Sequence, residues 1–224
     1  MSDTDSFIDE VTEEVRRDRL FLLFKRYGWI GAVVVILIVG GAAWREYSQA
    51  QARSQAQDVG DAMTAALSAD AAAARADGLA QIEAGSAGAQ AVVDMAEAAA
   101  RVDAGSPQEA VVLLDGIATN GDLPQVYRDI AAFKSVLLQA DTMSAQDRRL
   151  RLEALAAPGG TLQYLAAEQL ALLDIEAGDT TAALARLQEI SASVGVSRDL
   201  QERVSQVIVA LGGSPEADAQ DGDG

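Results

Sequence analysis

The side chains that could do chemistry in this sequence are almost all carboxylates. The chain has no His and no Cys, which excludes a Ser-His-Asp or Cys-His nucleophile pair, a His/Cys zinc site, a thiol redox centre and a disulfide. Carboxylate pairs remain as candidates for acid–base work. The closest sets are Asp141 with Asp147, and Asp174 with Glu176 and Asp179. Because they are spread along the expected polar helix faces, we interpret them as helix caps and solvated surface charges.

Three other kinds of site are also disfavoured. The Gly159-Gly160-Thr161 run lacks the lysine and the spacing of a phosphate-binding loop and is interpreted as a turn. No acid spacing matches an EF-hand calcium loop. With 34 acidic and 17 basic residues, the net charge of −17 disfavours DNA and RNA as partners. We therefore predict that the chain is not an enzyme and has no catalytic residue, cofactor, metal site, small-molecule substrate or nucleic-acid partner.

The elements that position these side chains are predicted to be helices. The chain has 224 residues, of which 45 are Ala, the best helix former. β-Branched and aromatic residues are sparse after residue 50, which disfavours strands. The predicted fold class is all-α, with one transmembrane helix followed by an α-solenoid of degenerate tetratricopeptide-like helical hairpins.

Residues 27–44 form an uncharged apolar run near the start of the chain. A helix of this length spans about 27 Å, close to the thickness of about 30 Å of a bilayer's hydrocarbon core. The sequence therefore predicts a transmembrane helix. The residues predicted to anchor it at the two membrane interfaces are Lys25, Arg26, Trp29, Trp44 and Arg45. Two alternatives stay open, a buried helix of a soluble protein and a cleavable signal peptide, although the latter usually has a shorter apolar run.

Basic residues predict the orientation of this helix. Residues 7–26 contain five Lys or Arg, whereas residues 45–64 contain two. Because the more basic flank stays in the cytoplasm, residues 1–26 are predicted to be a cytoplasmic amphipathic segment. The chain after residue 44 is then expected to lie across the membrane. Residues 45–85, rich in Ala, Gln and Ser, are expected to form an extramembrane helical stalk and the first helices.

A repeat of helix pairs is predicted for residues 86–211. Ala104-Gly105, Ala140-Asp141 and Ala177-Gly178 recur at separations of 36 and 37 residues, each with an apolar helical pattern before and after it. This period and the small residue in the turn are typical of tetratricopeptide-like pairs, in which a helix A, a tight turn and a helix B alternate. Residues 199–211 are predicted to form a final amphipathic helix that covers the last pair.

Local signals mark some of the boundaries. The run Ser106-Pro107-Gln108-Glu109 predicts an N-cap, a proline in the first turn and a capping-box acid at the start of one B helix. Asp179 is expected to open the last B helix. Residues 212–224 lack large apolar side chains and are expected to form a disordered acidic tail.

Three aromatic residues of the A helices are candidates for binding contacts. Tyr127 and Tyr164 lie 37 residues apart, and Phe133 lies at the same separation from Leu170. Because A helices usually line the groove of such arrays, Tyr127, Phe133 and Tyr164 are candidate contacts for a bound peptide. The alternative is that they pack between repeats, which we favour because aromatic residues at the repeat period are usually core.

The layout resembles that of the YfgM-like ancillary subunits of the bacterial Sec translocon. The resemblance depends on the segments 24–28 (FKRYG) and 43–47 (AWREY) around a Gly/Val-rich span, and on the stretch 164–173 (YLAAEQLALL) followed by Ala177-Gly178-Asp179. It extends over residues 7–211. It implies a bacterial inner-membrane protein with a periplasmic repeat domain beside the translocon, and the family has no catalytic residues to carry over. The acidic tail and the longer acidic N-terminus depart from the family pattern.

Two functions are compatible with these features. The expected one is a membrane-anchored periplasmic helical-repeat scaffold that binds translocon subunits, a periplasmic chaperone or emerging polypeptides, and assists exported-protein folding or chaperone recruitment. The alternative is a soluble or anchored periplasmic repeat protein that coordinates envelope assembly or cell division. Membrane extraction and the mass of the mature protein would separate an anchored chain from a cleaved one.

Overall fold

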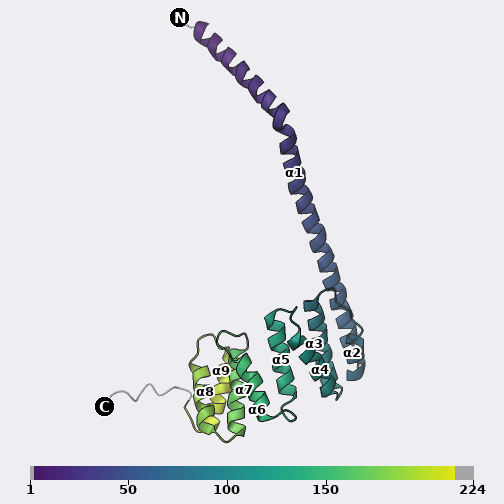
Figure 1. Ribbon diagram of the computed structural model, residues 1–224, viewed down its shortest axis with the longest axis vertical. Helices are drawn as coiled ribbons and strands as arrows, with labels where there is room; N and C mark the ends of the chain where they lie inside the picture. Colours follow the sequence, from purple (N-terminus) through teal and green to yellow (C-terminus); the bar gives the residue numbers. More distant parts are fainter. Residues whose placement is uncertain (1–2, 215–224) are drawn as a thin grey trace, which may run out of the picture. The chain divides into compact units, whose positions relative to one another are not determined.

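The computed structural model describes residues 3–214, and its side chains are described for residues 29–31 and 33–214. Between residues 3 and 214 it contains nine α-helices and no strand (Figure 1). The predicted all-α fold class is therefore confirmed. The chain divides into two compact units, Met1–Gln57 and Asp58–Gly224.

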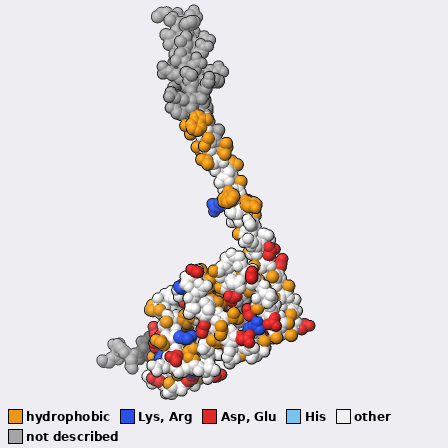
Figure 2. Space-filling model, turned by 45° about the vertical axis from the view of Figure 1, so that its right-hand side comes forward, with side chains coloured by type: hydrophobic (Ala, Val, Ile, Leu, Met, Phe, Trp, Pro, Cys, Tyr) orange, Lys and Arg blue, Asp and Glu red, His pale blue; other side chains and the backbone are white. Residues whose placement is uncertain are grey.

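Helix α1 (Asp3–Leu67) makes up the first unit and continues into the second. From Trp29 onward, α1 is long and apolar enough to cross a membrane, by length and composition. Its central aliphatic side chains are not buried (Figure 2), and Ile36 and Leu37 are each 68% exposed. A helix in the core of a soluble protein would bury such side chains, so this exposure argues against the buried-helix alternative. α1 is the one candidate membrane-spanning helix among the described residues, and the apolar run 27–44 lies within it.

The second unit begins with the end of α1 and the short helix α2 (Ala72–Leu79). Ala76 and Leu79 of α2 are fully buried, and Met63 and Ala66 of α1 pack against them. A Cβ added to Gly78 would lie 3.0 Å from the Cβ of Ala66, so glycine permits this close approach. Residues 58–85 thus belong to the folded unit, and within the expected stalk every side chain of residues 45–57 is exposed.

Three helix pairs and a final helix complete the second unit, as the repeat predicted. The pairs are α3 (Ala87–Asp103) with α4 (Pro107–Thr119), α5 (Gln125–Leu138) with α6 (Ala145–Leu155), and α7 (Gln163–Glu176) with α8 (Thr180–Ala192). The final helix is α9 (Arg198–Ala210), which packs on α8. From α2 to α9 each helix contacts its neighbours in the chain, and α3 also contacts α5 (Figure 1). This nearest-neighbour packing is that of a helical solenoid.

Two of the three predicted tight turns are formed. Gly105 and Gly178 end α3 and α7 with φ of 80° and 79°, in the left-handed region where glycine avoids steric strain. In both turns the amide after the glycine donates to the carbonyl five residues earlier, which is the Schellman arrangement. The predicted equivalent at Ala140-Asp141 is wrong. No non-glycine residue among those described has a positive φ, and α5 and α6 are instead joined by the six residues 139–144.

One of the two predicted caps is also absent. Pro107 is the first residue of α4 as predicted, but the Ser106 side chain accepts no capping hydrogen bond. Asp179 occupies the same place before α8 with similar backbone angles, and its carboxylate accepts a hydrogen bond from the amide of Ala182 at 2.9 Å. The longer side chain of Asp179 reaches the amide where the serine hydroxyl does not.

Burial repeats at a separation of 73 residues, which corresponds to two helix pairs. Ala110 and Leu114 of α4 are 0% and 2% exposed, and Ala183 and Leu187 of α8 are both 0% exposed. The middle pair follows a different register. Ala131 of α5 matches Ala166 of α7, both 0% exposed and 35 residues apart. The predicted equivalence of Tyr127 and Tyr164 at 37 residues is therefore out of register, because the turn used to align them is not formed.

The chain folds back after its last helix. Gly212 has a φ of 82°, and the amide of Gly213 donates to the carbonyl of Ile208 at 2.9 Å, so α9 ends as α3 and α7 do. The Gln188 side chain of α8 donates to the carbonyl of Ser214 at 3.5 Å. Residues 212–214 of the expected tail are thus attached to the helical unit, and residues 215–224 lie outside the described residues.

Candidate binding groove

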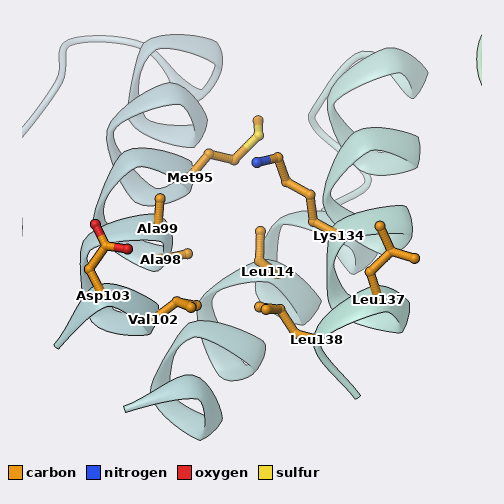
Figure 3. A pocket seen from close by; sticks show the side chains of 9 residues that line it. All are labelled: Met95, Ala98, Ala99, Val102, Asp103, Leu114, Lys134, Leu137 and Leu138. Carbon is orange, nitrogen blue, oxygen red and sulfur yellow. The ribbon is translucent and has the colours of Figure 1, made fainter. Parts of the chain in front are cut away.

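An open apolar groove lies between α3 and α5, with α4 as its floor (Figure 3). Its cavity has a volume of about 280 Å³. The apolar side chains that line it are Met95, Ala98 and Val102 of α3, Leu114 of α4, and Leu137 and Leu138 of α5.

The groove exists because α3 presents small side chains where it faces α5. Ala98 and Ala99 end at the Cβ atom, so they cannot fill the space between the two helices. Leu114 is 2% exposed and closes the floor, whereas Leu137 remains 40% exposed on the wall. An apolar surface that is hollowed and open to solvent is the usual form of a binding site for an apolar side chain.

Two charged residues lie on opposite walls of the groove. Asp103 of α3 pairs with Arg75 of α2, with Oδ2 and Nη2 3.6 Å apart. Lys134 of α5 is exposed, and its amine extends across the opening towards Met95 (Figure 3). Within residues 33–214, Lys134 forms no salt bridge. The groove is therefore apolar with one unpaired cation on its wall.

The three aromatic candidates do not line this groove. All are partly buried against core clusters: Tyr127 against the cluster of α3 and α4, Phe133 against that of α6 and α7, and Tyr164 against that of α8 and α9. Tyr164 also lines a smaller cavity of about 140 Å³ beside Arg186. These positions agree with packing between helices, the alternative that the sequence favoured.

A second cavity lies beside the start of α3 and the end of α4. Gln90 and Asp94 line it, and the Gln90 amide donates to the Asp94 carboxylate at 2.7 Å. The Gln90 side-chain oxygen accepts from the amide of Ala84 at 2.8 Å. These hydrogen bonds of Gln90 hold the connection between α2 and α3.

Of the five acidic residues singled out as carboxylate pairs, all except Asp141 are engaged in structural contacts. Glu176 pairs with Arg148 at 2.7 Å, and Asp147 accepts the hydroxyl hydrogen bond of Ser144 at the start of α6. Asp141 is exposed. The interpretation of Asp174 as a surface charge is wrong, because its side chain is 5% exposed and covered by arginines of α6 and α8.

Glu97 and Glu168 are two further carboxylates buried in the helical unit, each 8% exposed. Glu97 accepts two hydrogen bonds from Arg101 at 3.0 and 3.1 Å, and Glu168 accepts two from Arg203 at 2.9 and 3.0 Å. The hydrogen bonds to Glu97 raise the pKa of Arg101 above its ordinary value, and those to Glu168 raise the pKa of Arg203. These residues are ion-paired, so neither carboxylate is free to act as a base.

No group of three or more Asp or Glu side chains is placed to hold a metal ion in the part of the chain with described side chains. The anchor residues are placed as follows. Trp29 and Trp44 are 66% and 73% exposed on α1, and the rings of Trp44 and Tyr47 lie 6.5 Å apart. The side chains of Lys25 and Arg26 lie outside the described residues.

Lys134 is not among the site residues predicted from the sequence. A signal was present, since the chain has two lysines and this one stands within the apolar run Phe133-Lys134-Ser135-Val136-Leu137. Leu114 and Ala98 carried no such signal, because nothing in their own segments shows that α5 leaves a gap beside them.

No protein-family model, curated protein or solved structure matches this chain.

Proposed function

We propose that this chain is a membrane-anchored helical-repeat scaffold that binds partner proteins through the groove between α3 and α5. The proposed location is the bacterial inner membrane, with the N-terminus in the cytoplasm and the helical unit in the periplasm. In the form that the resemblance to YfgM-like subunits suggests, the partners are translocon subunits, a periplasmic chaperone and emerging polypeptides, and the scaffold assists exported-protein folding or chaperone recruitment.

The observation that carries the proposal is the open apolar groove on the helical unit. Leu137 is 40% exposed there, and the volume of about 280 Å³ is not filled by the chain's own side chains. Stacked helical repeats commonly bind peptides between their A helices, and α3 and α5 are such helices here. Anchoring would keep the scaffold at a high local concentration beside a membrane partner, which offsets a weak affinity for each client.

The proposed anchoring is supported by the apolar exposed part of α1, with Trp29 and Trp44 towards the ends of its apolar run. The proposed orientation is supported by the excess of basic residues in 7–26 over 45–64. An acidic helical unit on the far side would also not be attracted to an anionic lipid surface.

The first test is membrane retention of the full chain in bacterial cells. Alkaline extraction should leave the protein in the membrane fraction at its full mass of 23.3 kDa. A soluble species shortened by the length of the N-terminal segment would contradict the anchored form and support cleavage of a signal peptide.

The second test is site-specific photo-cross-linking of the full chain in living cells. A photoreactive side chain replaces Leu137 in the groove, and a matched control replaces Leu150, which is 67% exposed and lies outside the groove on α6. We expect cross-links to translocon subunits or to a periplasmic chaperone from position 137 and fewer from position 150. Cross-linking that is equal at the two positions would contradict binding through the groove, and the absence of translocon and chaperone partners would contradict the proposed location.

A further inference from the structure

We propose that the groove recognises an acidic–apolar segment of its partner protein. A Glu or Asp side chain of an amphipathic partner helix pairs with Lys134, and an adjacent aliphatic side chain enters the cavity between α3 and α5. The inference names the partner chemistry of the site described above and rests on the proposed function.

The first support is that Lys134 has no salt-bridge partner in a unit that has an excess of acids. Residues 58–214 contain 22 acidic and 10 basic side chains. Seven of these ten basic side chains form salt bridges, and the three that do not are Arg128, Lys134 and Arg198. Arg128 donates to the side chain of Gln125. Of the three, Lys134 is the one that lines the groove.

The second support is the shape of the site around the lysine. In Figure 3 the Lys134 amine extends towards Met95 of the opposite wall, and Leu114 and Leu138 also line the cavity. Apolar cavities of about 150 Å³ are known to hold a benzene-sized group. The volume of about 280 Å³ is therefore sufficient for a leucine or phenylalanine side chain of a partner.

The third support is that Asp103, the other charged residue of the groove, already has a salt-bridge partner. Asp103 pairs with Arg75 of α2, and its side chain stays 65% exposed. A partner lysine would have to compete with Arg75 for this carboxylate, whereas a partner carboxylate meets an unpaired amine at Lys134. The local charges therefore favour an acidic partner.

The net negative charge of the helical unit, by contrast, disfavours an acidic partner. An acidic partner is repelled at long range by the excess of carboxylates. Physiological salt screens interactions between exposed charges beyond about 8 Å, so the contact with Lys134 outweighs the distant carboxylates once the partner is bound. We expect association of an acidic partner to become slower, not faster, as the salt concentration is lowered.

The test uses the full chain in lipid nanodiscs and two fluorescent helical peptides. Both peptides carry the same leucine stripe and amidated C-termini, and they differ in having Glu or Lys beside the stripe. Fluorescence anisotropy should show tighter binding of the Glu peptide. Lys134→Gln should weaken this binding about threefold to fivefold, as for a partly exposed ion pair, and Lys134→Glu should make the Lys peptide the tighter ligand.

Arg198→Gln is the matched control, because Arg198 is also exposed and forms no salt bridge within residues 33–214 but lies on α9. It should leave the binding of both peptides unchanged. Equal binding of the two peptides, preference for the Lys peptide, no binding of the Glu peptide, or an unchanged affinity in Lys134→Gln would each overturn the inference. None of these outcomes affects cross-linking from position 137, so failure of the partner chemistry can be distinguished from failure of the proposed function.

Discussion

Arg101 of α3 and Asp174 of α7 occupy the same place in the repeat with opposite charges. Each lies four residues before the glycine that ends its helix, and the two are 73 residues apart. Arg101 contacts Asp77 of α2 at 3.0 Å and Glu109 of α4 at 3.5 Å. Asp174 contacts Arg149 of α6 at 2.7 Å and Arg186 of α8 at 3.3 Å. In both cases one side chain joins the preceding helix to the following one.

In the two helix pairs that share a burial register, this position carries a charge, and the sign of the charge differs between them. What changes is which member of the cluster is exposed. Asp174 is short and 5% exposed, and its two arginine partners are 35% and 32% exposed because their long stems reach inward from the surface. Arg101 is itself long, and its partners Asp77 and Glu109 are 71% and 62% exposed. In both clusters, the long side chain of the arginine spans the distance to the carboxylate.

The middle helix pair has a weaker version of the same connection. The Ser135 hydroxyl of α5 donates to Asp115 of α4 at 2.6 Å, and Arg151 of α6 lies 3.6 Å from the same carboxylate. Ser135 is uncharged and 0% exposed. The pair that lacks a central charge is also the one with the long connection after its A helix and the different burial register, so it departs from its neighbours in three respects.

The largest expected effects lie in the apolar core of the two helix pairs that carry the charged clusters. Leu187 of α8 and Leu114 of α4 are equivalent and nearly inaccessible, but Leu114 borders the groove. We expect Leu187→Ala to reduce the free energy of unfolding by about 3 to 4 kcal/mol and Leu114→Ala by about 2 to 3 kcal/mol, since Leu114 already borders an open space. Denaturant unfolding of the full chain in detergent, followed by far-UV circular dichroism, measures both. A larger loss for Leu114→Ala would show that the groove is filled in solution.

The next largest effect on stability is expected at the buried carboxylate of Asp174, and the exposed carboxylate of Asp141 should show almost none. Asp174→Asn keeps the shape but removes the charge that faces Arg149 and Arg186, and we expect it to cost about 2 kcal/mol, as for a hydrogen bond to a charged group. Asp141→Asn is the control, because Asp141 is exposed and no salt bridge to it is found within residues 33–214. It should change stability by less than about 0.5 kcal/mol. Equal effects of the two substitutions would mean that Asp174 contributes no more than a surface charge.

The burial of Asp174 could not be predicted from the sequence, although the helices and turns around it could. The A and B helices, the turns at Gly105 and Gly178 and the capping carboxylate of Asp179 depend on residues within one or two turns of helix, so local patterns were sufficient to predict them. The contacts of Asp174 come from residues 25 and 12 positions away in the chain. An acid on a helix has the same local pattern whether arginines of other helices cover it or water does.

The groove was not predicted for the same physical reason. Its floor and its two walls come from three helices, and its volume depends on the distance between α3 and α5, which no single segment specifies. The aromatic residues Tyr127, Phe133 and Tyr164 were predicted as candidate binding contacts because their side chains are large. Large apolar side chains are also the ones that fill the space between helices. An open site is more easily formed by small residues such as Ala98.

A smaller effect on stability is expected for Arg101→Gln, and the two charged clusters should differ in how salt and pH change such effects. We expect Arg101→Gln to lower stability less than Asp174→Asn, because Asp77 and Glu109 can return to water and the new amide can still donate to Glu97. High salt should reduce the effect of Arg101→Gln more than that of Asp174→Asn, since two of the three partners of Arg101, Asp77 and Glu109, are exposed and their pairs are screened more strongly.

The pH dependence of that effect has a defined sign. The hydrogen bonds to Glu97 raise the pKa of Arg101, so its stabilising contribution is fully present below the pKa of an unfolded arginine and is lost only as pH rises through the still higher folded value. The stability difference between the wild-type chain and Arg101→Gln should therefore be constant from about pH 7 to about pH 9. Unfolding curves of the two proteins across this range measure the difference, and a decline towards pH 9 would contradict the assigned pairing.

The smallest effect concerns the turns that follow the two clusters. Gly178→Ala places a side chain at a φ of 79° and should cost about 1 kcal/mol, and Gly105→Ala should cost the same at a φ of 80°. No atom lies within 4 Å of a Cβ added at either position, so the cost comes from backbone conformation alone. Asp141→Ala in the middle pair should have almost no effect, because that turn does not require the left-handed conformation. Thermal unfolding of the three variants measures the differences, and a loss at Asp141→Ala as large as at Gly178→Ala would mean that all three pairs use the same turn in solution.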